Sequence, residues 1–315
     1  MHRSTAPPQL QTQRNQYIEG ERTLNLLLIG LIDGVLTGAV YALMAAGLTL
    51  IFGVLDMINI AQGIFVILGS YLSLILEQHA GIGLFPGLII TIPAMFGLGL
   101  FVEWAFIRRI GAENRVTMSI LITYAVMIIV EGVLLLTYGS NYQSLSASYV
   151  TTSFQIAGHY IPEIYVYGFI LSVAAVVVLY AILYRTRLGT SLRASMDNAM
   201  AASLVGVNVK KVSTLAFGIG VAVTAIGGML FGAIQPFTPN TGYDLISRLL
   251  SIVVLGGLGS VGGALGGAMV MLIIEDVVST VWSPTWAPLL YFAVLIVVLL
   301  VKPTGIFGRQ AVRSQ

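Results

Sequence analysis

Three polar side chains, Asp56, Asn59 and Gln62, interrupt an apolar stretch near residue 60. Residues three apart share one face of a helix or gather at a break in it, so a carboxylate, two amides and free backbone groups would be presented together. In an apolar medium such groups are costly and usually meet a cavity or a partner. The pattern predicts part of a translocation path; the alternative is that the two amides only hydrogen-bond a neighbouring helix.

The composition indicates that the surrounding medium is a bilayer. Of the 315 residues, 57% are hydrophobic and 9% are charged, whereas ordinary soluble domains carry about 25% charged residues. A hydrocarbon core of about 30 Å requires about 20 apolar residues per helix. The sequence therefore predicts an all-α, polytopic integral membrane helix bundle in the cell (inner) membrane, surrounded by lipid and binding no nucleic acid. The expected apolar segments, about eight, lie near Leu24–Ala46, Leu48–Leu76, Leu84–Ile107, Thr117–Tyr138, Glu163–Tyr184, Val212–Ile234, Leu245–Ile274 and Trp282–Val301.

Enzymatic chemistry has little support in this sequence. Cysteine is absent, and His2, His79 and His159 lie in a tail and two connections, so neither a thiolate site nor a histidine metal cluster can be assembled. The GxGxxG match from Gly257 to Gly262 lacks the strand, crossover helix and acidic partner of a dinucleotide site. We expect no catalytic residue, metal or cofactor. A phosphate-binding GxxxxGK[ST] loop is also absent, so any ATP-driven function requires a separate subunit.

The basic residues gather in a few connections, which the positive-inside rule places in the cytoplasm. We expect the chain to divide into a flexible polar tail (1–23), a transmembrane domain (24–301) that contains a cytoplasmic segment (185–212), and a cytoplasmic tail (302–315). A short basic loop, 108–115, is expected on the same side. The loops expected outside are 78–83, 139–162 and 235–244.

This assignment of sides conflicts with the number of crossings. Two simple crossings return a chain to the side on which it started, yet two segments separate the tail from the loop at 78–83, and two separate the loop at 235–244 from the end. Both conflicts fall on interrupted segments, the first at Asp56 and Asn59 and the second in the run Gly256–Gly267. We predict two broken or re-entrant helices, which are tolerated at membrane depth where protein or a wet cavity surrounds them. A tail on the outer side is the alternative.

The glycine run is too dense to serve helix packing alone. Seven of its twelve residues are glycine, and each glycine inside a helix costs about 0.5–1 kcal/mol relative to alanine. We therefore predict a break there that contributes to the path. Two other acids in apolar segments, Asp33 and Glu131, are expected to pair structurally. The candidate path residues of the run are Gly256, Gly257, Gly259, Gly262 and Gly263.

The longest polar interval runs from Arg185 to Val212. Apolar residues recur at every fourth position after Gly189, which predicts one face of a short amphipathic helix ended by Gly206. They are Leu192, Met196, Met200 and Leu204. Such a helix could lie on anionic lipid; alternatively, its small residues would let it seat in a groove of an ATPase and move as a rigid lever. The candidate coupling residues are Arg193, Ala201, Ala202, Leu204 and Gly206.

Four stretches carry a family resemblance that covers nearly everything after residue 24. They are YALMAAGLTLIFGVLDMINIAQG (41–63), RTRLGTSLRASMDNAMAASLVGVN (185–208), VLGGLGSVGGALGG (254–267) and KPTGIFGR (302–309). The chain resembles the permeases of branched-chain amino acid ABC importers, in particular the LivH-like subunit. The resemblance implies two ATPase subunits, a second homologous permease subunit and an extracytoplasmic solute-binding protein as partners. It assigns Asn59 and Gly63, but not Asp56, to a family motif, and it implies alternating access driven through the helix at 191–205.

Departures from the family pattern concern the solute. Relatives usually have His-Gly-Glu where this chain has Gln62-Gly63-Ile64, and a proline where it has Gly262. Urea and short-chain amide permeases share much of the same pattern, so their solutes are an alternative to leucine, isoleucine and valine. A gradient-driven secondary transporter is a further alternative, with Asp56 as its coupling carboxylate and no need for a cytoplasmic docking helix.

Overall fold

The computed structural model describes residues 8–111, 115–156, 159–302 and 304–306, so the expectations for residues 1–7 and 307–315 lie outside it. Its elements in chain order are α1 (Pro8–Leu55), α2 (Gln62–Ala80), α3 (Leu84–Ala105), the 3-10 helix η1 (Ile107–Arg109), α4 (Arg115–Tyr138), α5 (Ser148–Thr151), β1 (Ser153–Ile156), β2 (His159–Pro162), α6 (Glu163–Arg185), α7 (Arg187–Leu204), α8 (Val209–Ile234), α9 (Thr241–Gly256), α10 (Val261–Val281) and α11 (Ala287–Val301).

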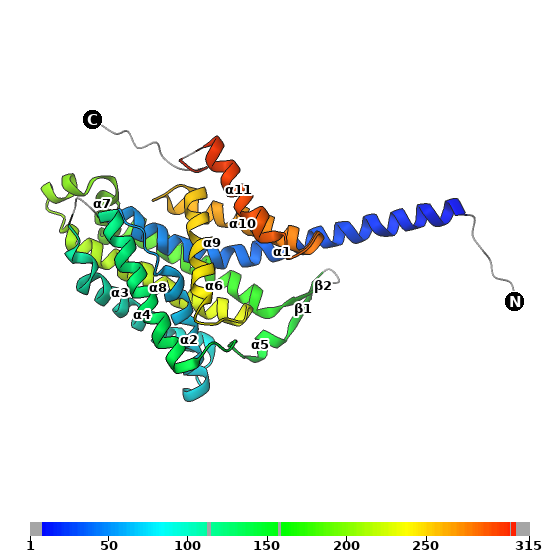
Figure 1. Cartoon of the computed structure of the whole chain (residues 1–315), viewed down its shortest axis with the longest axis horizontal. Coiled ribbons are helices and arrows are strands. Elements are labelled where there is room, and N and C mark those ends of the chain that lie inside the picture. Colours follow the sequence, from blue (N-terminus) through cyan, green and yellow to red (C-terminus); the bar gives the residue numbers. More distant parts are fainter. Residues whose placement is uncertain (1–7, 112–114, 157–158, 303, 307–315) are drawn as a thin grey trace.

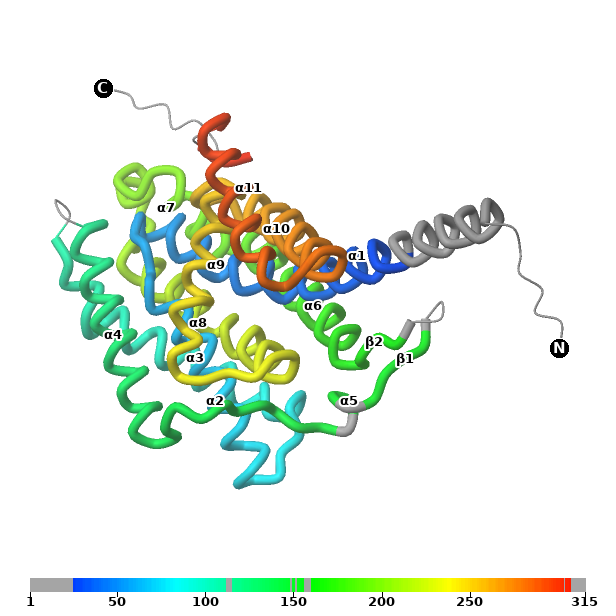
Figure 2. The backbone as a smooth tube through the Cα atoms, turned by 45° about the vertical axis from the view of Figure 1, so that its right-hand side comes forward, coloured from blue at the N-terminus to red at the C-terminus, as the bar shows by residue number. Residues whose placement is uncertain are grey.

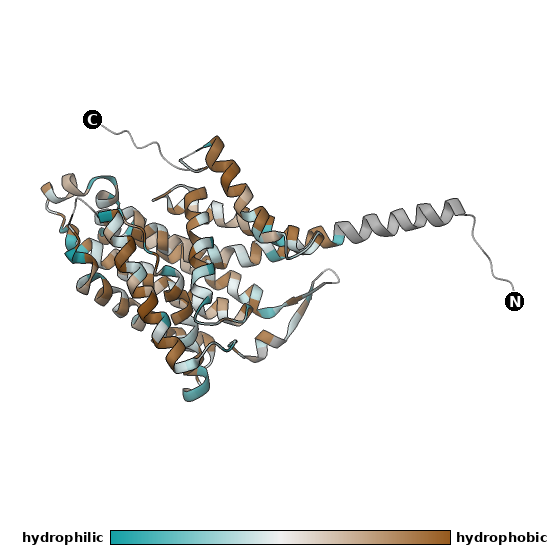
Figure 3. Cartoon of the chain, viewed as in Figure 1, coloured by the Kyte–Doolittle hydropathy of each residue, from teal (hydrophilic) through white to brown (hydrophobic). Residues whose placement is uncertain are grey.

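Helices make up most of the molecule (Figure 1), and Figure 3 shows hydrophobic residues along most of the bundle. Within the described residues, seven helices are long and apolar enough to cross a bilayer, and α11 is apolar but shorter. The sheet in this part of the chain is a two-stranded antiparallel hairpin of β1 and β2. The prediction of an all-α, polytopic membrane protein is confirmed.

Helix α1 is continuous where the sequence predicted a boundary between Ala46 and Leu48. Its residues in this region are buried, and Gly47 lies so close to α8 that a Cβ there would be 2.7 Å from the carbonyl oxygen of Gly220. The helix instead ends at Leu55, and Asp56 has a left-handed backbone with φ of 50°. The predicted interruption therefore separates two helices, α1 and α2, and does not divide one segment. The same helix begins at Pro8, so the backbone of residues 8–23, expected as part of a flexible tail, is helical.

Helix α8 is the most completely buried of the spanning helices. Glycine allows its neighbours to approach closely, because a Cβ at Gly228 would collide with the carbonyl oxygen of Val66 in α2. A Cβ at Gly99 in α3 would lie 2.9 Å from the Cα of Gly218 in α8. On the other side of the bundle, α1 lies along α10, as Figures 1 and 2 show.

Several basic connections lie at one end of this bundle, which we call the basic end. Gly53, near the end of α1, faces Met196 of α7 and the Cα of Gly53 lies near Gly259. The backbone N–H of Ile306 donates to the carbonyl oxygen of Leu255 at 2.7 Å. The basic end therefore comprises the end of α1, α7, the α9–α10 connection and residues 302 and 304–306.

The first residues of α1 whose side chains the structure describes lie at the opposite end of the bundle. There Ile29 and Asp33 lie beside Tyr160 and Tyr165 of the β2–α6 region, and a Cβ at Gly30 would lie 2.8 Å from the Cα of Val277 in α10. In this arrangement the start of α1 and the basic end lie at opposite ends of the bundle, as the alternative of a tail on the outer side requires. The physical reason is that α1 runs through the bundle once as an unbroken helix, which removes one of the two crossings predicted from apolarity.

Candidate functional site

Asn59 and Gln62 lie inside the bundle at the start of α2 and are fully buried, with 0% exposure. Nδ2 of Asn59 donates to Oε1 of Gln62 at 3.0 Å, and Nε2 of Gln62 donates to the carbonyl oxygen of Gly220 in α8 at 3.1 Å. The Oδ1 atom of Asn59 has no hydrogen-bond partner among the described residues. The amides thus connect the start of α2 to α8, as the alternative interpretation of the sequence proposed. Their role as path residues stays a prediction.

The other two residues of this predicted cluster have different surroundings. Asp56 is exposed at the basic end. Gly63 is buried, and a Cβ on it would collide with the carbonyl oxygen of Gly242 and lie 2.9 Å from the N atom of Ile246 in α9. The structure therefore brings Asn59, Gln62 and Gly63 together and leaves Asp56 apart. Glycine at position 63 allows the first turns of α2 and α9 to meet inside the bundle.

The predicted break in the glycine run is confirmed between α9 and α10. Gly257 and Gly259 have positive φ values of 97° and 80°, a conformation that suits glycine. Gly256 and Gly263 lie on either side of the turn, so close that a Cβ on Gly256 would collide with the carbonyl of Gly263. A Cβ on Gly259 would lie 3.7 Å from the Cα of Gly53. The two interruptions predicted from sequence are therefore neighbours in space.

The end of the described chain covers the same turn. A Cβ on Gly305 would lie 2.5 Å from the carbonyl oxygen of Val254 and 2.7 Å from the N atom of Gly257. Gly262, in contrast, has nothing within 4 Å of its Cβ position, so packing in this chain does not require a glycine there. Four of the five candidate glycines of the run thus have a structural reason to be glycine.

Helix α7 has a kink that the sequence analysis did not predict. Asn198 has non-helical angles of φ −160° and ψ 103°, and its Oδ1 accepts a hydrogen bond from the N–H of Ala201 at 2.9 Å. Before the kink, Leu192 is fully buried; after it, Met200 and Leu204 are 77% and 83% exposed. The predicted single apolar face is therefore wrong, because the kink turns the second part of the helix away from the bundle.

Residues 199–206 form a largely exposed tip. Some of the candidate coupling residues contact the rest of the bundle, and the others are exposed. Ala202 is buried against the chain, and the Arg193 guanidinium lies over the ring of Tyr184 in α6 at 4.7 Å. Gly206 ends the helix as predicted, with φ of 91°. Arg193 and Ala202 thus hold the segment in place. The exposed candidates are Ala201, Leu204 and Gly206.

A polar network joins α1, α9, α10 and α11. Nη1 of Arg248 contacts Oε1 of Glu275 at 2.5 Å in an ion pair, and the Tyr291 hydroxyl donates to the carbonyl oxygen of Arg248 at 2.9 Å. In α1, the Thr37 hydroxyl donates to Oδ2 of Asp276 at 2.7 Å. The pairing of Arg248 with Glu275 was not predicted from the sequence, because the two residues lie on different helices.

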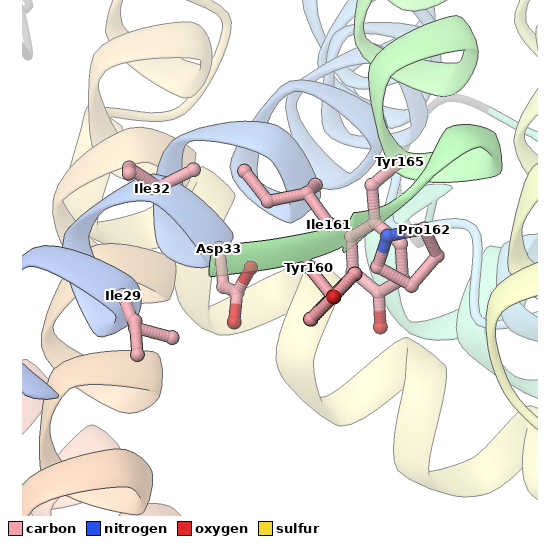
Figure 4. Close-up of a pocket in the computed structure, with 7 residues that line it drawn as sticks. All are labelled: Ile29, Ile32, Asp33, Tyr160, Ile161, Pro162 and Tyr165. Carbon is pink, nitrogen blue, oxygen red and sulfur yellow. The ribbon is translucent and has the colours of Figure 1, made fainter. Parts of the chain in front are cut away.

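A shallow pocket of about 300 Å³ lies at the hairpin end of α1 (Figure 4). The Asp33 carboxylate points into this pocket toward Tyr160 and Tyr165. It has no hydrogen-bond partner among the residues that the structure describes. The expected structural pairing is therefore not found for Asp33. It is confirmed for Glu131, whose Oε2 accepts a hydrogen bond from the Tyr243 hydroxyl at 2.7 Å. The pocket is lined by Ile29, Ile32, Asp33, Tyr160, Ile161, Pro162 and Tyr165.

Helix α9 carries a polar face that the sequence analysis missed. Tyr243, Asp244 and Ser247 are all exposed, on the first two turns of a helix whose other face is buried. The sequence analysis placed these turns partly in an outer loop, since it began the apolar segment at Leu245. The available signal was the spacing of polar side chains four apart at Tyr243, Ser247 and Ser251.

Comparison with known proteins gives a consistent result. Residues 30–299 match the family described as "Branched-chain amino acid transport system / permease component". The high-affinity branched-chain amino acid transport system permease protein LivH of Escherichia coli K12 is 30% identical over 297 residues, which cover 90% of this chain and 96% of that protein. BraD of Pseudomonas aeruginosa, with the same description, is 28% identical over 300 residues, with the same coverage.

An archaeal relative is also similar. The probable branched-chain amino acid transport permease protein LivH of Methanocaldococcus jannaschii is 30% identical over 230 residues, or 70% of this chain and 71% of that protein. No solved structure matches the chain significantly. These relatives are transport subunits and not enzymes, in agreement with the sequence analysis.

Proposed function

Because this chain belongs to the permease component family of branched-chain amino acid transport systems, we propose that it forms half of the translocation pathway of an ATP-binding-cassette importer. Its cargo is a branched-chain amino acid, as the names of its relatives suggest. Two ATPase subunits, a second homologous permease subunit and an extracytoplasmic solute-binding protein complete the importer. The basic end faces the cytoplasm, and the start of α1 therefore faces outward.

The exposed tip of α7 is the observation that carries this proposal. Met200, Leu204 and Val205 present apolar side chains that are 77%, 83% and 80% exposed, next to one another at the basic end. Outside the bilayer, such a patch on a structured segment marks a protein or membrane contact. The small side chain of Ala201 beside it leaves room for close approach, which suits a groove on an ATPase.

The attachment of α7 makes it suitable for transmitting force. The Thr186 hydroxyl accepts a hydrogen bond from the N–H of Gly189 at 3.0 Å, which fixes the tight turn from α6. Met196 packs against Gly53, which also adjoins the α9–α10 turn. A displacement of the tip would therefore be transmitted to both breaks in the bundle. We propose that binding of the ATPase at the tip drives alternating access in this way.

A matched pair of variants at Leu204 tests the proposal. Leu204→Glu places a charge in the middle of the apolar patch without altering a buried contact, whereas Leu204→Met keeps an apolar side chain of similar volume. We expect Leu204→Glu to lower ATP-dependent leucine uptake in proteoliposomes at least tenfold and to reduce copurification of the ATPase subunits. Leu204→Met should retain both activities.

Membrane insertion and the melting temperature of the permease serve as controls, and both variants should match the parent protein in these measurements. Undiminished uptake and ATPase association in Leu204→Glu would refute the role of the tip. Uptake that is independent of ATP and of the ATPase subunits would instead favour a gradient-driven transporter.

A further inference from the structure

The first turn of α9 lies midway between the two ends of the bundle. Gly242 contacts Gly63 in the first turn of α2. The neighbouring Gln62 donates to the carbonyl oxygen of Gly220, which lies near the middle of α8. Since α8 is long enough to cross a bilayer, α9 begins near the midplane of the membrane and runs to the basic end. With 16 residues, α9 is shorter than the seven helices that can cross a bilayer, and it starts at mid-depth of the bundle.

Helix α9 has two faces of opposite character. Leu245, Leu249 and Ile252 are buried in the bundle. On the opposite face, Tyr243 and Ser247 follow one another at a spacing of four, and Asp244 lies beside them; all three side chains are exposed. We call Tyr243, Asp244 and Ser247 the α9 polar face. The Ser247 hydroxyl donates to the backbone carbonyl of Tyr243 at 2.9 Å. Among the described residues, Asp244 is therefore the one side chain of this face without a hydrogen-bond partner.

Glu131 of α4 extends this polar surface. Glu131 as a residue is 8% exposed, and its carboxylate accepts a hydrogen bond from the Tyr243 hydroxyl at 2.7 Å. Tyr124 of the same helix lies beside Tyr243. Figures 1 and 2 show α9 between α4 and the pair α10 and α11. Two helices therefore contribute hydroxyl groups and carboxylates to one surface near the midplane.

Lipid is an unfavourable neighbour for this surface. Hydrocarbon offers no hydrogen bonds, and ionisable side chains at this depth face a wet cavity or a partner in membrane proteins. The rest of the described chain leaves the α9 polar face exposed. Water must therefore reach it, or another protein must cover it.

We infer that the α9 polar face, with the Glu131–Tyr243 pair, is this subunit's lining of the aqueous path for a small zwitterionic solute. This inference rests on the proposed function, which supplies a path between two permease subunits. Asp244 offers a carboxylate to the solute's ammonium group, and the Tyr243 ring offers an apolar surface to the solute's side chain. The Ser247 and Tyr243 hydroxyl protons are already donated within the protein, so their oxygens accept hydrogen bonds from water or from the ammonium group. On the buried side of α9, Gly63 contacts Gly242 and Ile246.

The absence of cysteine from the chain allows a direct test in the complete importer. Ser247→Cys changes one atom and introduces the single thiol of this subunit. Ile252→Cys is a control on the buried face of α9, and Ile129→Cys is a control at an exposed apolar site of α4. The partner subunits are used in cysteine-free form. The probe is a charged, water-soluble methanethiosulfonate, applied to proteoliposomes with and without ATP.

We expect the thiol of Ser247→Cys to react at least tenfold faster than both controls in at least one nucleotide state. Saturating leucine and binding protein should slow this reaction severalfold, and the modified importer should lose uptake. Reaction no faster than at Ile129→Cys in every state would overturn the inference, because the face would then be covered by lipid or by dry protein. Fast reaction without any effect on uptake would overturn it as well.

A second variant separates this inference from the proposed function. We expect Asp244→Asn to lower leucine uptake at least tenfold while ATP hydrolysis stimulated by the binding protein is retained, because the ATPase contact at α7 is intact. Loss of the α7 contact would instead reduce both activities. Unchanged uptake in Asp244→Asn would refute the role of the carboxylate. Failure of the unmodified importer to transport leucine would refute the proposed cargo, and the reactivity of Ser247→Cys would then still test whether the α9 polar face lines an aqueous path.

Discussion

Replacing Gln62 by methionine tests whether this residue supports the bundle or touches the solute. Gln62→Met keeps the length of the side chain and removes both buried hydrogen bonds, to Asn59 at 3.0 Å and to Gly220 at 3.1 Å. Each such bond contributes about 0.5–1.5 kcal/mol. The Asn59 amide, which is already unpaired at Oδ1, would also lose the partner of its Nδ2 atom. We therefore expect a loss of about 2–4 kcal/mol in the free energy of unfolding.

The double variant Asn59→Leu/Gln62→Met makes this reasoning more specific. Replacing both partners of a buried polar pair by apolar groups is close to neutral, whereas removing one partner leaves the other unsatisfied. We expect the double variant to be more stable than Gln62→Met by at least about 1 kcal/mol. This order is opposite to the one expected if the two substitutions acted independently.

Thermal unfolding of the purified complex in detergent measures the stability, and uptake per folded complex in proteoliposomes measures function. We expect lower melting temperatures in Gln62→Met, partial recovery in the double variant, and nearly unchanged uptake per folded complex in both. A normal melting temperature combined with slow uptake would refute the structural role of Gln62 and would place this residue in contact with the solute.

Two further predictions concern packing and charge. Gly228→Ala should destabilise the bundle by about 1–3 kcal/mol, because the added Cβ would collide with the backbone of α2. The control Gly97→Ala, whose Cβ meets open space in α3, should be neutral or slightly stabilising. Equal melting temperatures for the two variants would contradict this prediction. Arg248→Met should lower the free energy of unfolding by about 3 kcal/mol, because Glu275 loses its counter-charge. The double variant Arg248→Met/Glu275→Leu should recover most of this stability. A double variant as unstable as the single one would show that the ion pair is not the cause.

The sequence predicted the positions of the helix interruptions correctly, but it did not predict that α1 is one continuous helix. Glycine and polar residues revealed the breaks after Leu55 and after Gly256, because their backbone preferences and their cost in a helix are local properties. The boundary predicted near Ala46 was wrong. Small residues there allow contact with α8, and in sequence the same residues resemble a weak point in a helix.

The orientation of polar groups depended on partners far away in the chain. Gln62 is buried because its amide reaches Gly220, a residue distant in sequence. Glu131 pairs with Tyr243 in the same way. Helical spacing shows that such residues share a face, but it does not show what covers that face. Inside or outside could therefore be decided only by the packing of helices that are separated in sequence.

Sequence alone determined the bilayer environment, the helical class, the positions of both interruptions and the end of α7 shortly before Gly206. These follow from composition and from local backbone chemistry. The tertiary structure decided that α1 crosses the bundle once, that the kink at Asn198 exposes the tip of α7, and that Tyr243 and Ser247 are exposed while Asn59 is buried. These outcomes are set by close contacts between distant helices, and the free energy of each contact depends on both of its partners.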